Sequence, residues 1–133
     1  MERARTVLRW ILGVAMILVG ITHFTSSEWF VHIMPPWIPF HLAMVLVSGA
    51  AEIALGAALL VPRTKRLASY GLVALYVAVF PANLHMALHH VTPIDAPDTP
   101  AWALWARLPV QLVLIAWALW VGREATAGQR ARS

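Results

Sequence analysis

The sequence has 133 residues, which is close to the typical length of one domain, about 150 residues. Of these, 60% are apolar and 12% are charged, against about 25% charged residues in an average soluble domain. There is no cysteine, which excludes disulfide frameworks, cysteine-ligated metal centres and thiol relays. The composition therefore predicts an integral membrane protein and excludes a soluble enzyme, a nucleic-acid-binding protein and a disordered tail.

Four apolar runs are each long enough to cross a bilayer, because about 20 helical residues span a hydrocarbon core of ~30 Å. They cover residues 7–24, 41–61, 67–89 and 101–121. We therefore predict an all-α fold in which the whole chain forms a single transmembrane domain, a bundle of four helices.

The basic residues indicate how this bundle is oriented. The two connections 25–40 and 90–100 contain neither Lys nor Arg. By the positive-inside rule we predict that both termini, with the polar tail 122–133, are cytoplasmic and that the protein lies in the plasma (inner) membrane. The basic residues that carry this prediction are Arg3, Arg5, Arg9, Arg63, Lys65, Arg66, Arg123, Arg130 and Arg132.

The first outer connection is predicted to hold a short helix on the membrane surface. Residues 25–28 have a capping-box pattern, with Thr25 at the N-cap and Glu28 three positions later. The helix is expected to extend to about Met34, where Pro35 and the proline after it end it. Three of its side chains are expected to face the bilayer, namely Trp29, Phe30 and Ile33.

Glycine spacing predicts that the first two spans pack closely. Gly13 and Gly20 lie seven residues apart in the first span, and Gly49 and Gly56 have the same spacing in the second. A seven-residue spacing keeps small residues on one face, where two helix backbones can approach. We expect a tight hairpin of these two spans.

Ionisable residues within a span are candidate functional residues, because each costs about 2.5–3.5 kcal/mol near the bilayer centre. Glu52 lies eleven residues into the second span, a depth of ~16 Å at the helical rise of 1.5 Å per residue. Arg107 enters from the outer side of the fourth span, with Gln111 one turn deeper. The predicted ligand-binding residues are Glu52, Asn83, Arg107, Gln111 and His23.

Two prolines fall among these polar residues and are predicted to kink the third and fourth spans. Pro81 frees the backbone carbonyl of Val77, and Pro109 frees that of Trp105. Free carbonyls at this depth need protein, water or ligand as partners. The pattern predicts a polar pocket that opens toward the outer face.

The same polar residues have a structural interpretation that the sequence leaves open. Glu52, either protonated or paired with Arg107, Gln111 or His23, would hold helices together. The amides of Asn83 and Gln111 would also serve as interhelical bonds.

The histidines suggest a metal or haem site as a weaker alternative. His85 and His89 lie one turn apart on one helical face, a spacing that can chelate a metal. The glutamate of a zinc-protease motif is missing from this pair. Otherwise these are ordinary histidines of the membrane interface.

Four segments of the chain resemble the DoxX-like membrane proteins: GITHFTSSEWFVHIMPPWIP, SGAAEIALGAALLVPRTKRLASYGL, FPANLHMAL and LWARLPVQLVLIAWALW. That family takes its name from a subunit of a thiosulfate:quinone oxidoreductase, and a distant relative is an assembly chaperone. The resemblance implies a four-helix bundle with these residues facing its interior: His23, Glu52, Pro81, Asn83, Arg107, Pro109 and Gln111.

The leading hypothesis is a site for a quinone or a similar lipid-soluble ligand in an accessory subunit of a membrane redox complex. Arg107, Gln111 and Asn83 would bond the ligand's oxygens, and Glu52 with His23 would form a proton relay. No residue is assigned a catalytic role, because such a subunit needs a partner's cofactor to oxidise anything. The alternatives are an assembly factor or scaffold that packs against partner helices, and an oligomeric transporter of a small solute or proton. The sequence is also compatible with a homodimer, but it does not fix the oligomeric state.

Overall fold

The computed structural model describes residues 2–123, and the regular structure in this range is entirely helical. Helix α1 spans Glu2–Thr25, α2 Ser27–Ile33, α3 His41–Leu60, α4 Lys65–His89 and α5 Ala101–Val121. All of these except α2 are long and apolar enough to cross a membrane. The all-α class and the four long apolar helices are confirmed, and they are the pattern of a membrane protein. The predicted tail lies outside the described residues from position 124 on.

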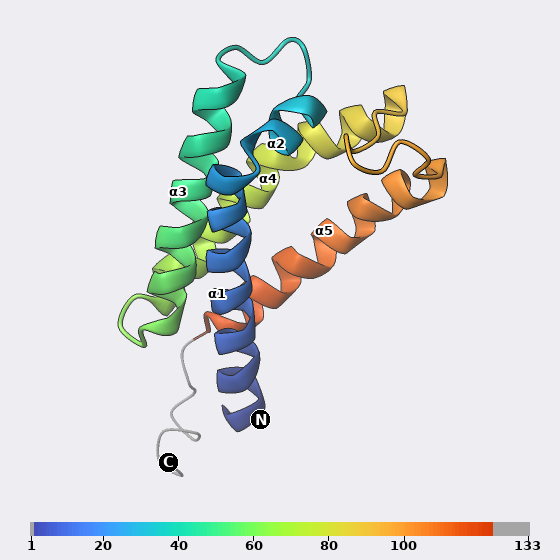
Figure 1. Ribbon diagram of the computed structural model, residues 1–133. Coiled ribbons are helices and arrows are strands. Elements are labelled where there is room, and N and C mark those ends of the chain that lie inside the picture. The colour runs from blue at the N-terminus through green and yellow to red at the C-terminus, as the bar shows by residue number, and fades with distance from the viewer. Residues whose placement is uncertain (1, 124–133) are drawn as a thin grey trace.

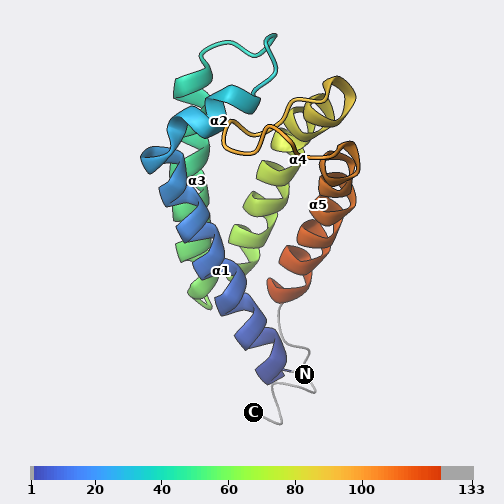
Figure 2. The same ribbon diagram turned by 45° about the vertical axis from the view of Figure 1, so that its right-hand side comes forward.

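The four long helices alternate in direction (Figure 1): α1 and α4 run toward the end of the molecule that carries α2, and α3 and α5 run away from it. Helix α1 packs along α3, and α4 packs along α5, while α3 also contacts α4. Figure 2 shows α2 and the α4–α5 connection at one end of the molecule, with the start of α1 and the end of α5 at the other. The two pairs lie farther apart at the end with α2, which is the end that holds the candidate site.

The α1–α3 pair is held at very close range by its glycines. A Cβ atom added to Gly20 would lie 2.7 Å from the backbone oxygen of Gly49, and one added to Gly56 would lie 2.7 Å from that of Gly13. Real Cβ atoms do not come this close to a backbone oxygen, so a larger residue would push the helices apart. The predicted tight hairpin is confirmed.

At the opposite end from α2, a buried arginine joins the same two helices. The Arg9 side chain is 6% exposed, and its Nη1 donates a hydrogen bond of 2.7 Å to the backbone oxygen of Leu59. A cation beside the last turn of a helix is favourable because the carbonyl groups there have no helical partner. Nearby, Trp117 of α5 donates to the backbone oxygen of Leu8 at 3.2 Å. These two bonds bring α1, α3 and α5 together over an apolar core.

The start of α2 differs from the prediction. Its N-cap is Ser26, which makes no side-chain capping bond, and Thr25 is the last residue of α1. The Ser26 backbone N–H donates to the carbonyl of Thr22 at 2.8 Å. Because helical hydrogen bonding continues past Thr25, this residue cannot serve as the first cap of the next helix, and the predicted capping box is wrong.

Candidate functional site

A cavity of about 470 Å³ lies between the helices at the end of the molecule that carries α2. Helices α1, α2, α3 and α4 form its walls, and α5 contributes one side chain, Arg107. Most of the lining is apolar, including Val19, Leu75 and Val79. The polar side chains in the lining are His23, Ser48, Glu52, Asn83 and Arg107. Four of the five predicted ligand-binding residues therefore meet in one cavity.

His23 of α1 and Glu52 of α3 form the first polar group of this cavity. Their Nδ1 and Oε2 atoms lie 3.0 Å apart, and the two side chains are 9% and 11% exposed. Gly49 makes room for this pair, since a Cβ atom there would lie 2.5 Å from the Cβ of His23. The two atoms are each other's polar partner, and neither makes a hydrogen bond to another group of the described residues. Both residues also line the cavity, so a ligand or water there can reach them.

Helix α2 covers the cavity with two aromatic side chains. The Phe30 ring lies 3.9 Å from the His23 ring, measured between centroids, and Trp29 lies beneath the Arg107 guanidinium at 5.8 Å. The Trp29 indole Nε1 donates a 2.8 Å hydrogen bond to Asp95 in the α4–α5 connection. Each of these two residues therefore contacts a different polar group of the cavity.

The three α2 side chains that were expected to face the bilayer line the cavity instead, namely Trp29, Phe30 and Ile33. Ile33 is only 8% exposed. The physical reason is that the cavity offers these side chains an apolar lining. It also offers the two aromatic rings polar partners that lipid tails lack, namely His23 and Arg107.

Arg107 of α5 forms the second polar group of the cavity. It lies on a different helix from His23 of α1 and Glu52 of α3. Its Nη1 makes one weak contact, at 3.8 Å to the Met86 sulfur. Among residues 2–123, no carboxylate oxygen lies within 4.0 Å of this guanidinium. Of the three partners that the sequence left open for Glu52, the structure places His23 beside it rather than Arg107.

Asn83 and Gln111 join α4 to α5. Asn83 Nδ2 donates a 2.8 Å hydrogen bond to Gln111 Oε1, and Gln111 Nε2 donates in turn to the backbone oxygen of Tyr76. Gln111 is 4% exposed and is not part of the cavity lining. Both ends of its amide are bonded, so the structure gives it the role of an interhelical bond. Asn83 uses one of its two amide hydrogens here and lines the cavity as well.

Pro81 and Pro109 both lie inside helices that continue through them, since α4 and α5 are unbroken at these positions. The Gln111 bond to the Tyr76 carbonyl falls one residue before the carbonyl that Pro81 was expected to free. The bond therefore holds α5 against α4 close to Pro81, but its acceptor is not the carbonyl that the proline frees.

The predicted histidine pair is present but lies outside the cavity lining. The rings of His85 and His89 are 4.6 Å apart. Within residues 2–123, no group of three or more His, Cys, Asp or Glu side chains comes together in a way that could hold a metal ion. The candidate metal site is thus a pair of ligands without a third.

Ser48, Trp29 and Phe30 belong to the cavity but were not predicted to bind a ligand. A signal for Ser48 was present, because it lies one helical turn before Glu52 and therefore shares its face. Nothing in the sequence indicated that the two aromatic residues turn inward.

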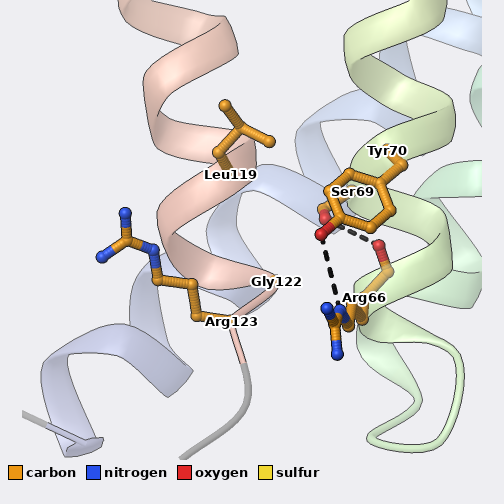
Figure 3. Close-up of a pocket in the computed structure, with 6 residues that line it drawn as sticks. All are labelled: Arg66, Ser69, Tyr70, Leu119, Gly122 and Arg123. Carbon is orange, nitrogen blue, oxygen red and sulfur yellow. Dashed lines mark hydrogen bonds between the residues drawn. The ribbon is translucent and has the colours of Figure 1, made fainter.

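A second cavity, of about 400 Å³, lies at the far end of α4 and α5. Figure 3 shows Tyr70 beside Arg66, whose Nε donates to the Tyr70 hydroxyl at 3.5 Å. This cavity shares no residue with the first, and its arginines belong to the basic flanks of the spans. Its lining consists of Arg66, Ser69, Tyr70, Leu119, Gly122 and Arg123.

Comparison with known families assigns the chain to a family. A family model described as a domain of unknown function, DUF8561, matches residues 12–122. The chain belongs to the DUF8561 family. No curated protein and no solved structure matches it significantly.

The resemblance to the DoxX-like proteins is therefore wrong, since the matching model is that of DUF8561. The motifs that suggested DoxX are short, and they consist of the polar and proline residues that a small helical bundle needs inside a membrane. The features common to such bundles are thus not specific to one family. DUF8561 membership covers every residue that lines the cavity.

Proposed function

We propose that this DUF8561 protein is a membrane protein that binds a small lipid-soluble ligand whose head carries oxygen atoms. The observation that carries the proposal is the cavity itself, which has apolar walls and two separate polar groups on different helices. Binding sites for small molecules typically combine a mostly apolar lining with a few polar side chains that fix orientation. A quinone head and the head of a lipid acid both belong to this class.

The two polar groups would contact different parts of such a head. Arg107 and Asn83 offer N–H donors to its oxygens, and the buried atoms of His23 and Glu52 can give or accept a proton. The sequence hypothesis placed Gln111 among the ligand contacts, and we omit it because both ends of its amide are bonded.

We further propose that the cavity lies in the outer half of the plasma membrane and that both termini are cytoplasmic. This orientation is supported by the basic residues near the start of α1 and in the α3–α4 connection, and by their absence from residues 25–40 and 90–100. The ligand would then enter from the outer leaflet or from the outer surface.

The proposal can be tested by filling the cavity with a larger side chain. Ala82 lines the cavity, whereas Ala74, two turns earlier on α4, is exposed on the outside of the helix. We expect Ala82→Phe to abolish binding and Ala74→Phe to leave it intact. Native mass spectrometry of the detergent-purified proteins, titrated with decylubiquinone and with oleic acid, measures both effects.

Helical circular dichroism and a melting curve verify that each variant is folded. Ser48→Leu is a second cavity variant in case Ala82→Phe does not fold. The proposal is overturned if the folded wild-type protein carries no small molecule and binds neither probe, or if both cavity variants bind like wild type.

A further inference from the structure

We infer that the ligand of this cavity is an anionic amphiphile, with one acidic head bound by Arg107 and an apolar body along the cavity walls. The inference rests on the proposed function, because it names the chemistry of the ligand at the same site. The acidic head is a carboxylate or a phosphate, and the experiment below separates these two sources.

The first argument is the charge of Arg107. A guanidinium group stays protonated in proteins and carries five N–H donors. Arg107 is half-buried, and among the described residues it contacts the Met86 sulfur at 3.8 Å and the Trp29 ring at 5.8 Å. Neither contact carries a negative charge. A partly buried cation in an apolar cavity without a counter-ion is costly, and a bound anion would offset that cost.

The second argument is that the neighbouring acidic side chains have other partners. Glu52 Oε2 lies 3.0 Å from His23 Nδ1, on helices other than that of Arg107. The Asp95 carboxylate accepts the indole N–H of Trp29. In the part of the chain that the structure describes, Glu52 is the one acidic side chain that lines the cavity. The position opposite Arg107 is therefore left for an acid from outside the chain.

The third argument is that the contact of the guanidinium with Trp29 leaves its N–H donors available. The guanidinium lies over the face of Trp29, and Trp29 is fixed in turn by its bond to Asp95. A cation–π contact uses none of the N–H donors of an arginine, so these donors stay available for two parallel bonds to a carboxylate or phosphate. Asn83 lines the same cavity and adds a neutral amide donor.

The fourth argument concerns the rest of the ligand. Side chains from α1, α3 and α4 give the cavity apolar walls, among them Val19, Met44, Val45, Leu75 and Val79. A small hydrophilic anion would make no apolar contact with these walls, whereas a neutral lipid would leave the charge of Arg107 without a counter-ion. An acid with one apolar chain satisfies both parts of the cavity.

The test compares ligands that share one chain and differ in the head. Oleic acid, oleyl alcohol and oleoyl lysophosphatidic acid are titrated at pH 8 against the protein in a neutral detergent, with binding read by native mass spectrometry. We expect the wild type to bind the acids about tenfold or more tightly than the alcohol, as suits a charge-assisted bidentate contact. Arg107→Gln should lose this preference and keep its affinity for the alcohol, while Arg107→Lys should keep part of it.

Arg63→Gln is the matched control, because it removes the same charge from an exposed position in the α3–α4 connection. It should bind all three ligands like wild type. Tighter binding of oleic acid assigns a carboxylate head, and tighter binding of the lysophosphatidic acid assigns a phosphate head. Circular dichroism establishes that the variants are folded. If Arg107→Gln does not fold, Arg107→Lys serves as the test variant in its place.

Equal affinity of the wild type for oleic acid and oleyl alcohol overturns the inference, as does an unchanged preference in folded Arg107→Gln. Binding of decylubiquinone without binding of either acid overturns the inference but retains the proposed function. Failure of every probe to bind overturns both.

Discussion

Asn83 of α4 and Gln111 of α5 bond to each other, at 2.8 Å between Nδ2 and Oε1, although both were predicted to bind a ligand. The two residues differ in what else they contact. Gln111 also donates to the Tyr76 carbonyl, away from the cavity, whereas Asn83 lines the cavity. Ligand binding and helix pairing are therefore divided between neighbouring polar residues, and they can be separated by substitution.

We expect Gln111→Leu to lower the free energy of unfolding by about 1–3 kcal/mol, because it leaves the buried Tyr76 carbonyl without this donor. Probe affinity should stay close to that of wild type. Leu112→Ala, at a position that is 63% exposed, is the control and should change neither quantity by much. Denaturant titration followed by circular dichroism gives the stability. Loss of probe binding with unchanged stability would contradict this assignment.

The close approach of α1 and α3 predicts that Gly20→Ala is destabilising. Its Cβ would lie 2.7 Å from the Gly49 backbone oxygen, which cannot move without moving α3, and overpacking of this kind costs about 1–3 kcal/mol. Gly71→Ala is the matched control, since the nearest atom there is the Cδ2 of Leu55, at the end of a side chain that can rotate. The melting temperature should fall in the first variant alone, and equal melting temperatures would argue against a rigid glycine contact.

The buried hydrogen bond of Arg9 predicts a cost for its removal. Arg9→Met keeps most of the side-chain volume but loses the bond to the Leu59 carbonyl, and we expect a loss of about 1.5–3 kcal/mol, the usual value for a bond with a charged group. Arg3→Met removes the same charge from an exposed position on α1 and serves as the control. If the two variants unfold at the same denaturant concentration, the Arg9 bond contributes nothing measurable.

The bond between Trp29 and Asp95 predicts that Trp29→Phe loosens α2. Phenylalanine keeps a ring beneath Arg107 but has no indole N–H to donate. Amide hydrogen exchange over residues 26–34 should become about two- to tenfold faster, in line with the loss of about 0.5–1.5 kcal/mol. Trp102→Phe, at a position that is 73% exposed, should leave this segment unchanged. An unaltered exchange rate in Trp29→Phe would show that other contacts hold α2.

The proposed orientation can be measured directly because the chain contains no cysteine. Single cysteines are introduced as Arg63→Cys in the α3–α4 connection and Asp98→Cys in the α4–α5 connection. A membrane-impermeant maleimide added to intact spheroplasts should label the cysteine at position 98 and leave the one at position 63 unlabelled until the cells are lysed. The reverse pattern would place the cavity in the cytoplasmic half.

The sequence predicted the helices well because burial in a membrane leaves a simple signal along the chain. The predicted spans 41–61 and 101–121 correspond to α3 at His41–Leu60 and α5 at Ala101–Val121. The first span was predicted to begin at residue 7, whereas α1 begins at Glu2. Hydropathy falls at the charged residues there, but backbone hydrogen bonds continue through them, so the apolar run was shorter than the helix.

The site was predicted less completely, because its contacts depend on how each helix is rotated about its own axis. The free-energy cost of placing an ionisable side chain within a span identified Glu52 and Arg107 as candidates, and both line the cavity. It could not show that Glu52 lies beside His23, since that contact requires the close approach at Gly49. The sequence likewise could not predict that Trp29 faces the cavity, because an aromatic side chain at a membrane surface packs equally well against lipid and against protein.

The contacts of α1 also bear on how the protein is made. Arg9 finds its carbonyl partner 50 residues later in the chain, and the glycine face of α1 meets that of α3. When the ribosome has released only the first apolar segment, the polar partners that Arg9 and His23 contact in the folded protein have not yet been made, because both lie on α3. We therefore expect the nascent chain to enter the bilayer as a pair of segments, with the first waiting beside the insertion machinery until the second arrives.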